Sequence, residues 1–248
     1  MERIREFFDN VTLQSVLSDL SHVIALERLG PRISERVFWR APIQDRRVAL
    51  TFDDGPHPTY TPQLLTLLAK YEVPATFFLI GRHIARDPGL AREVAAGHEV
   101  GNHTFTHPPL FRLSDDAMRE EILRTDELLR SLDGVVPRFL RPPMGLFSRR
   151  VLDVVEAAGY KTVVGDVYPR DPHQPGRKRI VSRVLRRVTR GSIIILHDGG
   201  NTSHVDRSQT VWAVGRLIPE LLQRGFEFVT LSALLAAHLA ESSEQDQD

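Results

Sequence analysis

Short apolar runs alternate with amphipathic segments along most of this sequence, and that alternation limits the folds the chain can adopt. The runs are typical of buried β-strands, and the segments between them carry apolar residues at helical spacing. The connecting loops are short, and no linker or sequence repeat divides the chain. One domain built from βα units follows, either a closed barrel or an open doubly wound sheet.

We expect about seven strands, each followed by a helix. The predicted strands cover 48–52, 75–80, 99–100, 139–140, 162–164, 192–196 and 227–229. The predicted helices cover 62–71, 83–96, 115–132, 149–158, 178–189, 208–224 and 232–240. Ser114 and Ser148 stand where N-caps are expected, and Gly159 ends the helix that Ser148 begins.

The two ends of the chain differ from this alternating part. Residues 1–45 are expected to form a helix over about 11–29 and then an extended lead-in, in which Phe38 and Trp39 anchor a loop on the core. Residues 46–240 form the predicted domain. The polar tail 241–248 is expected to be disordered.

Composition excludes some partners and some kinds of site. Lys plus Arg equals Asp plus Glu at 32 each, so net charge gives no reason to expect nucleic acid. The chain has no Cys, so any transition metal must be held by His, Asp or Glu. No apolar run approaches the roughly 18 residues of a membrane span. Because Asp9 and Asp19 interrupt any signal-peptide core, a cytoplasmic location is favoured.

Polar side chains follow five of the predicted strands, directly or a short loop later. The carboxyl ends of parallel strands meet at one face of the fold, so these side chains are expected to share one site at the mouth of a barrel. They are Asp53 and Asp54, His103 and His107, Arg141, Asp171, and His197 with Asp198.

Two adjacent carboxylates, Asp53 and Asp54, end the first of these strands before Gly55-Pro56. Like charges this close repel in a low dielectric, which indicates a compensating cation, and a metal ion would supply it. The alternative is an Asp-Asp-Gly turn that only closes the strand.

His103 and His107 stand four residues apart, a spacing that puts two imidazoles on one face of a helical turn. Together with a carboxylate of the aspartate pair they would make a His₂Asp catalytic metal set with one position open for water. The alternative is a pair of histidines in a turn. Arg141 could make a bidentate hydrogen bond to a carboxylate, or it could form a surface ion pair. His197 could titrate near neutral pH, or it could be a hydrogen-bonded core histidine.

Together these residues resemble the polysaccharide deacetylase family, carbohydrate esterase family 4, which contains the NodB homology domain. The resemblance covers about residues 46–232 and implies a distorted (β/α) barrel. The matching motifs are Thr51-Phe-Asp-Asp-Gly-Pro56, His103-Thr-Phe-Thr-His107, Arg141-Pro-Pro-Met-Gly145 and Ile195-Leu-His-Asp198.

The resemblance implies a role for each matching position. Asp54, His103 and His107 would hold a divalent metal, with Zn²⁺ favoured and Co²⁺, Mn²⁺ or Ni²⁺ open. Asp53 would be the general base for the metal-bound water, and Arg141 would hold it charged and oriented. His197 would protonate the leaving amine. Substrate contacts would come from the backbone N–H of Met144 at the oxyanion, from Ile195 at the acetyl methyl group, and from Pro143 and Tyr168.

The fourth motif of the family is altered in this chain. Counting back from Pro175-Gly176, Asp171 takes the place of the aspartate that tunes the catalytic histidine, and Asp166 competes for that place if the loop is shorter. Pro172 and Gly165 stand where the family usually has tryptophan. We predict that the carboxylate beside His197 raises the pKa of this histidine and keeps it protonated at neutral pH.

The leading prediction is therefore a metal-dependent N-deacetylase that releases acetate from a saccharide containing N-acetylglucosamine. Two alternatives stay open. One is a non-sugar amidase or acetyl esterase on the same fold, and the other is a non-catalytic saccharide-binding domain.

Overall fold

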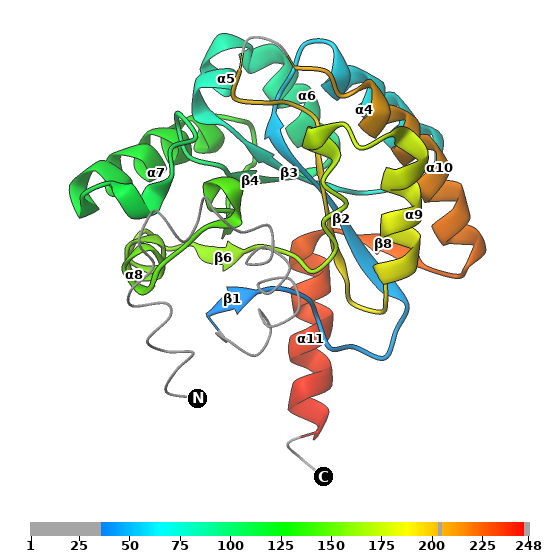
Figure 1. Ribbon diagram of the computed structural model, residues 1–248. Helices are drawn as coiled ribbons and strands as arrows, with labels where there is room; N and C mark the ends of the chain where they lie inside the picture. The colour runs from blue at the N-terminus through cyan, green and yellow to red at the C-terminus, as the bar shows by residue number, and fades with distance from the viewer. Residues whose placement is uncertain (1–35, 203–204, 246–248) are drawn as a thin grey trace.

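The computed structural model describes residues 36–202 and 205–245, which form one parallel sheet with helices packed outside it (Figure 1). The predicted N-terminal helix over 11–29 lies outside the described residues. The strands are β1 (Val37–Phe38), β2 (Arg47–Gly55), β3 (Thr76–Leu79), β4 (Glu99–Asn102), β5 (Phe139–Leu140), β6 (Lys161–Val163), β7 (Ile193–His197) and β8 (Glu227–Val229).

The strands follow the order β1-β6-β5-β4-β3-β2-β7, and β8 pairs with β2. The sheet curls until its two sides meet beyond β6. There the N–H of Val167 donates to the carbonyl of Ile193 at 3.2 Å, and the N–H of Ile195 donates to the carbonyl of Val167 at 2.9 Å. The result is a distorted (β/α) barrel, as expected, with its polar strand ends at one mouth.

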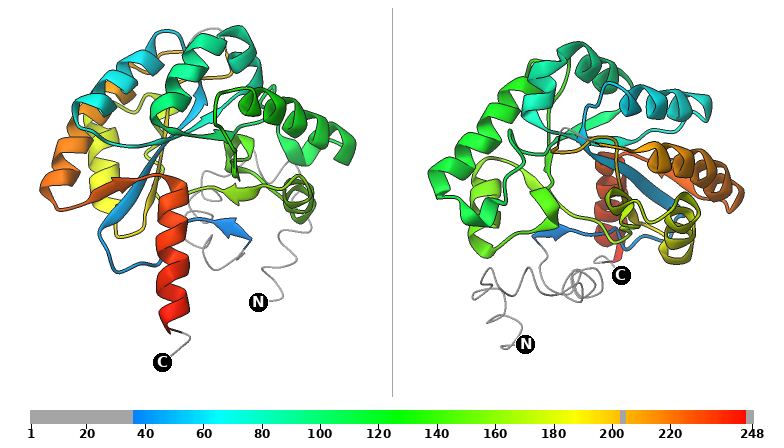
Figure 2. Two further views of the ribbon diagram at one scale, coloured as in Figure 1. Left: turned by 180° about the vertical axis from the view of Figure 1, so that it is seen from behind. Right: turned by 45° about the horizontal axis from the view of Figure 1, so that its top comes forward.

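Most of the helices lie around the outside of this curved sheet in both views of Figure 2, whereas α11 lies below it and packs Leu231 and Leu234 on the inner cluster. They are α4 (Tyr60–Lys70), α5 (Gly81–Arg86), α6 (Pro88–Gly97), α7 (Asp115–Arg130), α8 (Arg149–Ala157), α9 (Arg177–Arg187), α10 (Ser208–Gln223) and α11 (Leu231–Gln245). Three short 3₁₀ turns join them: η1 (Leu110–Arg112), η2 (Pro143–Gly145) and η3 (Asp171–His173). Of the helices within the described ranges, none combines the length and apolarity of a membrane span.

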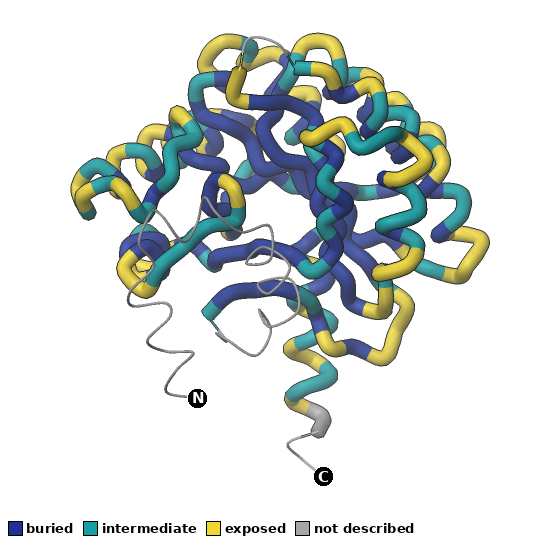
Figure 3. Tube along the Cα trace, viewed as in Figure 1, coloured by how far each residue is buried: buried dark blue, intermediate teal, exposed yellow. Residues whose placement is uncertain are grey.

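The two faces of β2 show how the core is divided. Successive side chains of a strand point to opposite faces. Val48, Leu50 and Phe52 pack with the helices, whereas Ala49 belongs to the cluster inside the barrel. β7 follows the same rule, with Ile194 and Leu196 outside and Ile193 inside. Because Asp53 and His197 share the parity of the inner residues, both are directed into the barrel, where the wall is almost entirely buried (Figure 3).

Three predicted boundaries are wrong, each for a local reason. Residues 37–38, expected in a loop, form β1, although Phe38 and Trp39 are buried as anchors, as predicted. The helix over 83–96 is two helices, because Asp87 caps α6 by accepting from the N–H of Leu90 at 3.0 Å and a proline follows it.

The third wrong boundary is at the C-terminus. The tail expected to be disordered from 241 continues α11 as far as Gln245. The carboxylate of Glu241 accepts a hydrogen bond from the N–H of Gln44 at 3.0 Å, which ties this last part of the helix to the lead-in before β2. The predicted N-caps Ser114 and Ser148 are confirmed, since each hydroxyl accepts from the N–H three residues later.

Candidate active site

A bulge at the end of β2 brings two neighbouring carboxylates into one site. In the pairing with β3, Asp53 lies opposite Phe78 and Gly55 opposite Leu79, so Asp54 is an extra residue in β2. Asp54 has a positive φ of 73°. Without the bulge, strand alternation would direct Asp54 away from the barrel interior. The strand thus runs through Asp53 and Asp54 to Gly55, rather than ending before the pair.

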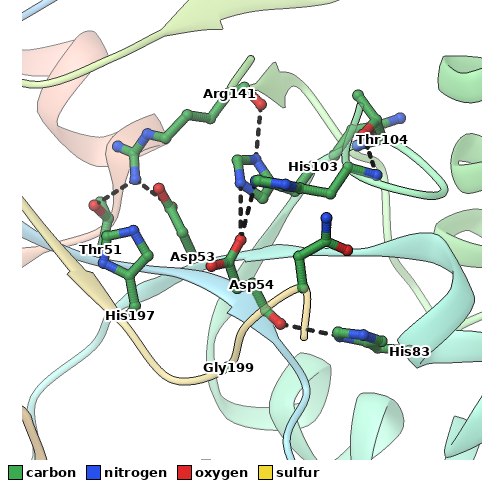
Figure 4. Close-up of polar contacts among 12 residues, drawn as sticks. Thr51, Asp53, Asp54, His83, His103, Thr104, Arg141, His197 and Gly199 are labelled. Atoms are coloured by element: carbon green, nitrogen blue, oxygen red, sulfur yellow. Dashed lines mark hydrogen bonds and ion pairs between the residues drawn. The ribbon is translucent and has the colours of Figure 1, made fainter. Parts of the chain in front are cut away.

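Asp54 lies against His103 (Figure 4) and also against His107, and both histidines follow β4. Its Oδ1 is 3.3 Å from Nε2 of His103 and 3.2 Å from Nε2 of His107. The three ligand atoms lie within 4.8 Å of one another. Asp54 Oδ1 is buried and has no hydrogen-bond partner among the described residues. A carboxylate oxygen and two imidazole nitrogens converging in this way fit a divalent metal ion.

The hydrogen bonds of His103 determine which of its ring nitrogens faces Asp54. His103 donates from Nδ1 to the carbonyl of Arg141 at 2.8 Å, which leaves the lone pair on Nε2, facing Asp54. Burial, with a further contribution from His103, lowers the pKa of His107 to about 4. Burial disfavours the charged form of Asp54, but the interactions with His103 and the other nearby imidazoles outweigh it and lower the pKa of Asp54.

Asp53 has a different partner from Asp54. Nη1 of Arg141 donates to Asp53 Oδ1 at 2.6 Å and to the hydroxyl oxygen of Thr51 at 2.8 Å. The guanidinium is buried and lies 4.2 Å over the ring of Phe78. Asp53 therefore lies next to the metal ligands while its own carboxylate is held by a cation of the protein (Figure 4).

His197 lies on β7, the neighbour of β2, and the β2–β7 register sets it opposite Asp53. Its Nδ1 donates to Asp171 Oδ1 at 3.0 Å, and its backbone N–H donates to Asp171 Oδ2 at 2.9 Å. Burial opposes protonation of His197, but the charge and hydrogen bond of Asp171 outweigh it and raise the pKa of His197 to about 9. The other candidate, Asp166, instead accepts from Ser192 and from the N–H of Ile193.

An apolar cluster lies beneath His197. Ile195 precedes His197 on the same face of β7 and packs with Trp39 and Tyr168. The ring of Tyr168 is 6.0 Å from that of His197. At Gly165 (φ +126°) a Cβ atom would lie only 2.8 Å from Ile195 Cγ1, so no side chain fits at this position.

The Arg141-Pro-Pro-Met-Gly145 loop forms another part of the rim. Pro143 is buried, and Met144 is 56% exposed in a left-handed conformation with φ 61°. The N–H groups of Gly145 and Leu146 donate to carbonyls of this turn. Within the described residues, the N–H of Met144 has no acceptor, so it is available to a bound group.

Three residues that support the site were not predicted from the sequence. His83, on α5, donates from Nδ1 to the backbone carbonyl of Asp54 at 3.0 Å (Figure 4). Thr210, on α10, donates to Asp171 at 2.8 Å. Thr61 donates to Asp198, whose pKa is raised to about 7 by burial, with nearby Asp54 adding to the effect. The one signal in the sequence is their position, since each is a polar residue at or next to the start of a predicted helix.

Known proteins resemble this chain in sequence and in fold. Residues 40–163 match the polysaccharide deacetylase family. A peptidoglycan-N-acetylglucosamine deacetylase of Bacillus cereus is 43% identical over 202 residues, which is 80% of this chain and 92% of that protein. A chitooligosaccharide deacetylase of a Bradyrhizobium species is 44% identical over 198 residues, 76% of this chain and 90% of that protein.

Two solved structures share the fold. A peptidoglycan N-acetylglucosamine deacetylase superposes with a TM-score of 0.76 at 33% identity, covering 80% of this chain and 92% of that one. A pseudoenzyme of carbohydrate esterase family 4 from Bacillus anthracis superposes with a TM-score of 0.74 at 27% identity, covering 82% of this chain and 70% of that one. Matches of this extent in sequence and in fold show that the chain belongs to the polysaccharide deacetylase family, hydrolases of carbon–nitrogen bonds other than peptide bonds.

Proposed function

We propose that this protein is a metal-dependent N-deacetylase that hydrolyses the acetamido groups of an N-acetylglucosamine-containing saccharide and releases acetate. One observation carries the proposal. Asp53 lies between a candidate metal set (Asp54, His103 and His107) and a histidine, His197, that is protonated at neutral pH.

Amide hydrolysis needs a nucleophile at neutral pH, charge stabilisation at the carbonyl oxygen and a proton for the leaving nitrogen. Asp54, His103 and His107 would hold a divalent ion, which would meet the first two needs by lowering the pKa of water and polarising the carbonyl. The remaining steps fall to other side chains.

Asp53 is the proposed general base. Its carboxylate is fixed by Arg141 at 2.6 Å and makes no ion pair with His103 or His107. A carboxylate that is held in place but is not needed as a metal ligand can accept the proton of the attacking water.

His197 is the proposed general acid. Asp171 accepts a hydrogen bond from Nδ1–H, so the proton available to the leaving nitrogen is the one on Nε2. With a pKa of about 9, His197 carries this proton at neutral pH and can donate it to the leaving nitrogen. The free N–H of Met144 would donate to the oxyanion, and Ile195 would contact the acetyl methyl group.

The substrate class comes from the relatives, two of which are named for peptidoglycan N-acetylglucosamine and for chitooligosaccharides. Both substrates present the same acetamido group. Zn²⁺ is the proposed ion, because a His₂Asp set without Cys suits Zn²⁺, although such a set also accepts Co²⁺, Mn²⁺ or Ni²⁺.

The test is acetate release by the purified protein before and after removal of metal. Chitooligosaccharides, peptidoglycan strands, acetylxylan and a non-sugar acetamide serve as substrates, and elemental analysis gives the bound metal. We expect acetate from the N-acetylglucosamine substrates only, abolished by chelation and restored by Zn²⁺. Metal uptake without acetate from any substrate would instead favour a non-catalytic saccharide-binding domain, and preference for the ester or the acetamide would favour the corresponding alternative.

A further inference from the structure

Positive charge is concentrated on one outer helix of the barrel. Six of the eleven residues of α9 are Lys or Arg, although the whole chain has no net charge. No acidic residue occurs between Asp171 and Asp198. We call the six basic side chains of α9 the basic face. They are Arg177, Lys178, Arg179, Arg183, Arg186 and Arg187.

The charges on this face lie close together and are unfavourable for the helix. Arg179, Arg183 and Arg187 are spaced i, i+4, a spacing at which like charges destabilise a helix. Three cations also occupy the first turn, where the helix dipole favours anions. Burial and then the surrounding arginines lower the pKa of Arg183, as expected where positive charges crowd.

On two other helices, α7 and α10, arginines pair with acids of the same helix. On α7, Arg130 lies 2.7 Å from Asp126, and on α10, Arg224 lies 2.8 Å from Glu220. Within the described residues, Lys178, Arg179 and Arg186 have no such carboxylate partner. All three are exposed, and the outer side of α9 faces solvent (Figures 1 and 3).

The basic face begins at the candidate active site. Asp171, which binds His197, precedes the first residue of α9 by only six positions, and Nη1 of Arg183 donates to the carbonyl of Pro169 in the same loop at 2.8 Å. The helix then leads away from the mouth of the barrel for about 16 Å. A polymer that occupies the mouth and continues beyond it can therefore run along these side chains.

A groove between α9 and α10 adds to this surface. It has a volume of about 370 Å³ and is lined by Lys178, Trp212 and Arg216, among others. The guanidinium groups of Arg177 and Arg216 lie 4.7 and 5.5 Å from the Trp212 ring centre. The acid in the groove, Glu220, is already paired with Arg224.

We infer that the basic face binds an acidic glycan strand, the carboxylate-bearing polymer whose acetamido groups are hydrolysed in the neighbouring site. This inference rests on the proposed function and refines it, because it favours acidic peptidoglycan strands over neutral chitooligosaccharides. An anionic membrane fits less well. The apolar residues Ile180 and Val184 of α9 are buried, and α9 exposes no large hydrophobic side chain that could enter a bilayer.

The test reverses two exposed charges of the face, in the variant Arg179→Glu/Arg186→Glu. These residues are seven apart and share one side of the helix. Glutamate suits the first turn of a helix, at Arg179, and is disfavoured in the last turn, at Arg186, so the fold of the variant is checked by circular dichroism. Arg92→Glu/Arg138→Glu is the matched control, with the same change in net charge at two exposed arginines elsewhere.

Acetate release is measured with soluble peptidoglycan glycan strands, which carry carboxylates, and with neutral chitohexaose. We expect kcat/KM of the Arg179→Glu/Arg186→Glu variant to fall about tenfold on the acidic strands at low salt. The difference should shrink in about 1 M salt, and chitohexaose turnover should stay at the wild-type value. An equal fall on both substrates, or the same fall in the control variant, would overturn the inference.

Binding of the same acidic strands by calorimetry separates this inference from the proposed function. If the wild-type protein releases no acetate, the proposed function fails, yet weaker strand binding by the variant would still support the basic face. Unchanged strand binding, with weaker binding to vesicles of anionic lipid instead, would assign the face to a membrane and refute the inference.

Discussion

Replacing Asp171 by asparagine tests the proposed proton donor most directly. Asp171 accepts three hydrogen bonds. They come from Nδ1 of His197 at 3.0 Å, from the backbone N–H of His197 at 2.9 Å and from the hydroxyl of Thr210 at 2.8 Å. Asparagine has nearly the same shape and keeps one acceptor oxygen, so the imidazole can remain in place. The substitution removes the negative charge.

The magnitude follows from the pKa of His197, which is about 9 against an ordinary value of 6.5. That difference corresponds to about 3 kcal/mol in favour of the imidazolium. Without the Asp171 charge, burial acts against only the weaker effects of Asp53 and Asp54, so we expect the pKa at or below its ordinary value. At pH 8 a group with a pKa of 9 is roughly 90% protonated and one with a pKa of 6.5 roughly 3%, a difference of about 30-fold.

The assay is the pH profile of kcat for acetate release from a chitooligosaccharide. Wild-type activity should fall above about pH 9, because a general acid is active below its pKa. In Asp171→Asn that fall should begin at least two pH units lower, so the variant loses about 30-fold at pH 8 but less than about twofold at pH 6. Asp166→Asn is the matched control and should leave the alkaline limb unmoved. An unmoved limb in Asp171→Asn would refute the reasoning.

Three further predictions concern the base, the metal and its support. Asp53→Asn should lower kcat at least about 100-fold with bound metal unchanged, since Asp53 is held by Arg141 and not by the imidazoles; parallel loss of metal would contradict this. His107→Ala should lose metal and activity together by elemental analysis and acetate assay, whereas turnover with the metal retained would remove His107 from the ligand set. His83→Leu should weaken Zn²⁺ binding about tenfold in a competitive chelator titration, and His83→Asn, which keeps a donor, should bind nearly as the wild type; equal affinities would deny His83 a supporting role.

Much of the barrel could be predicted because its strands are apolar runs with a fixed alternation. Asp53 and His197 stand at the ends of two such runs, which is why the sequence predicts both at the mouth, and the inner residues of β2 and β7 continue in alternation to them. β1 escaped prediction because two residues carry no periodicity and pair only with β6, far along the chain. The division between α5 and α6 had a local signal, Asp87 before a proline, that outweighs helical spacing.

Contacts that depend on tertiary structure could not be predicted from spacing. The choice between Asp166 and Asp171 depends on the path of the loop after β6, in which Arg170 and Gln174 both adopt positive φ. The count back from Pro175-Gly176 favoured Asp171 but left Asp166 open, and only the folded loop shows that Asp171 is the one that contacts His197. His83 supports Asp54 through a backbone carbonyl, so the sequence around Asp54 contains no trace of the contact.

The separate roles of the two adjacent aspartates depend on one extra residue in β2. Side chains of like charge next to each other in a buried site repel, and a single cation shared between them would make both carboxylates ligands. The bulge at Asp54 separates them, so that Asp53 meets a guanidinium while Asp54 meets two imidazoles. A base that is not consumed as a ligand can therefore stand beside the metal set. The hydrogen bond from His83 to the backbone carbonyl of Asp54 holds the bulge that makes this separation possible.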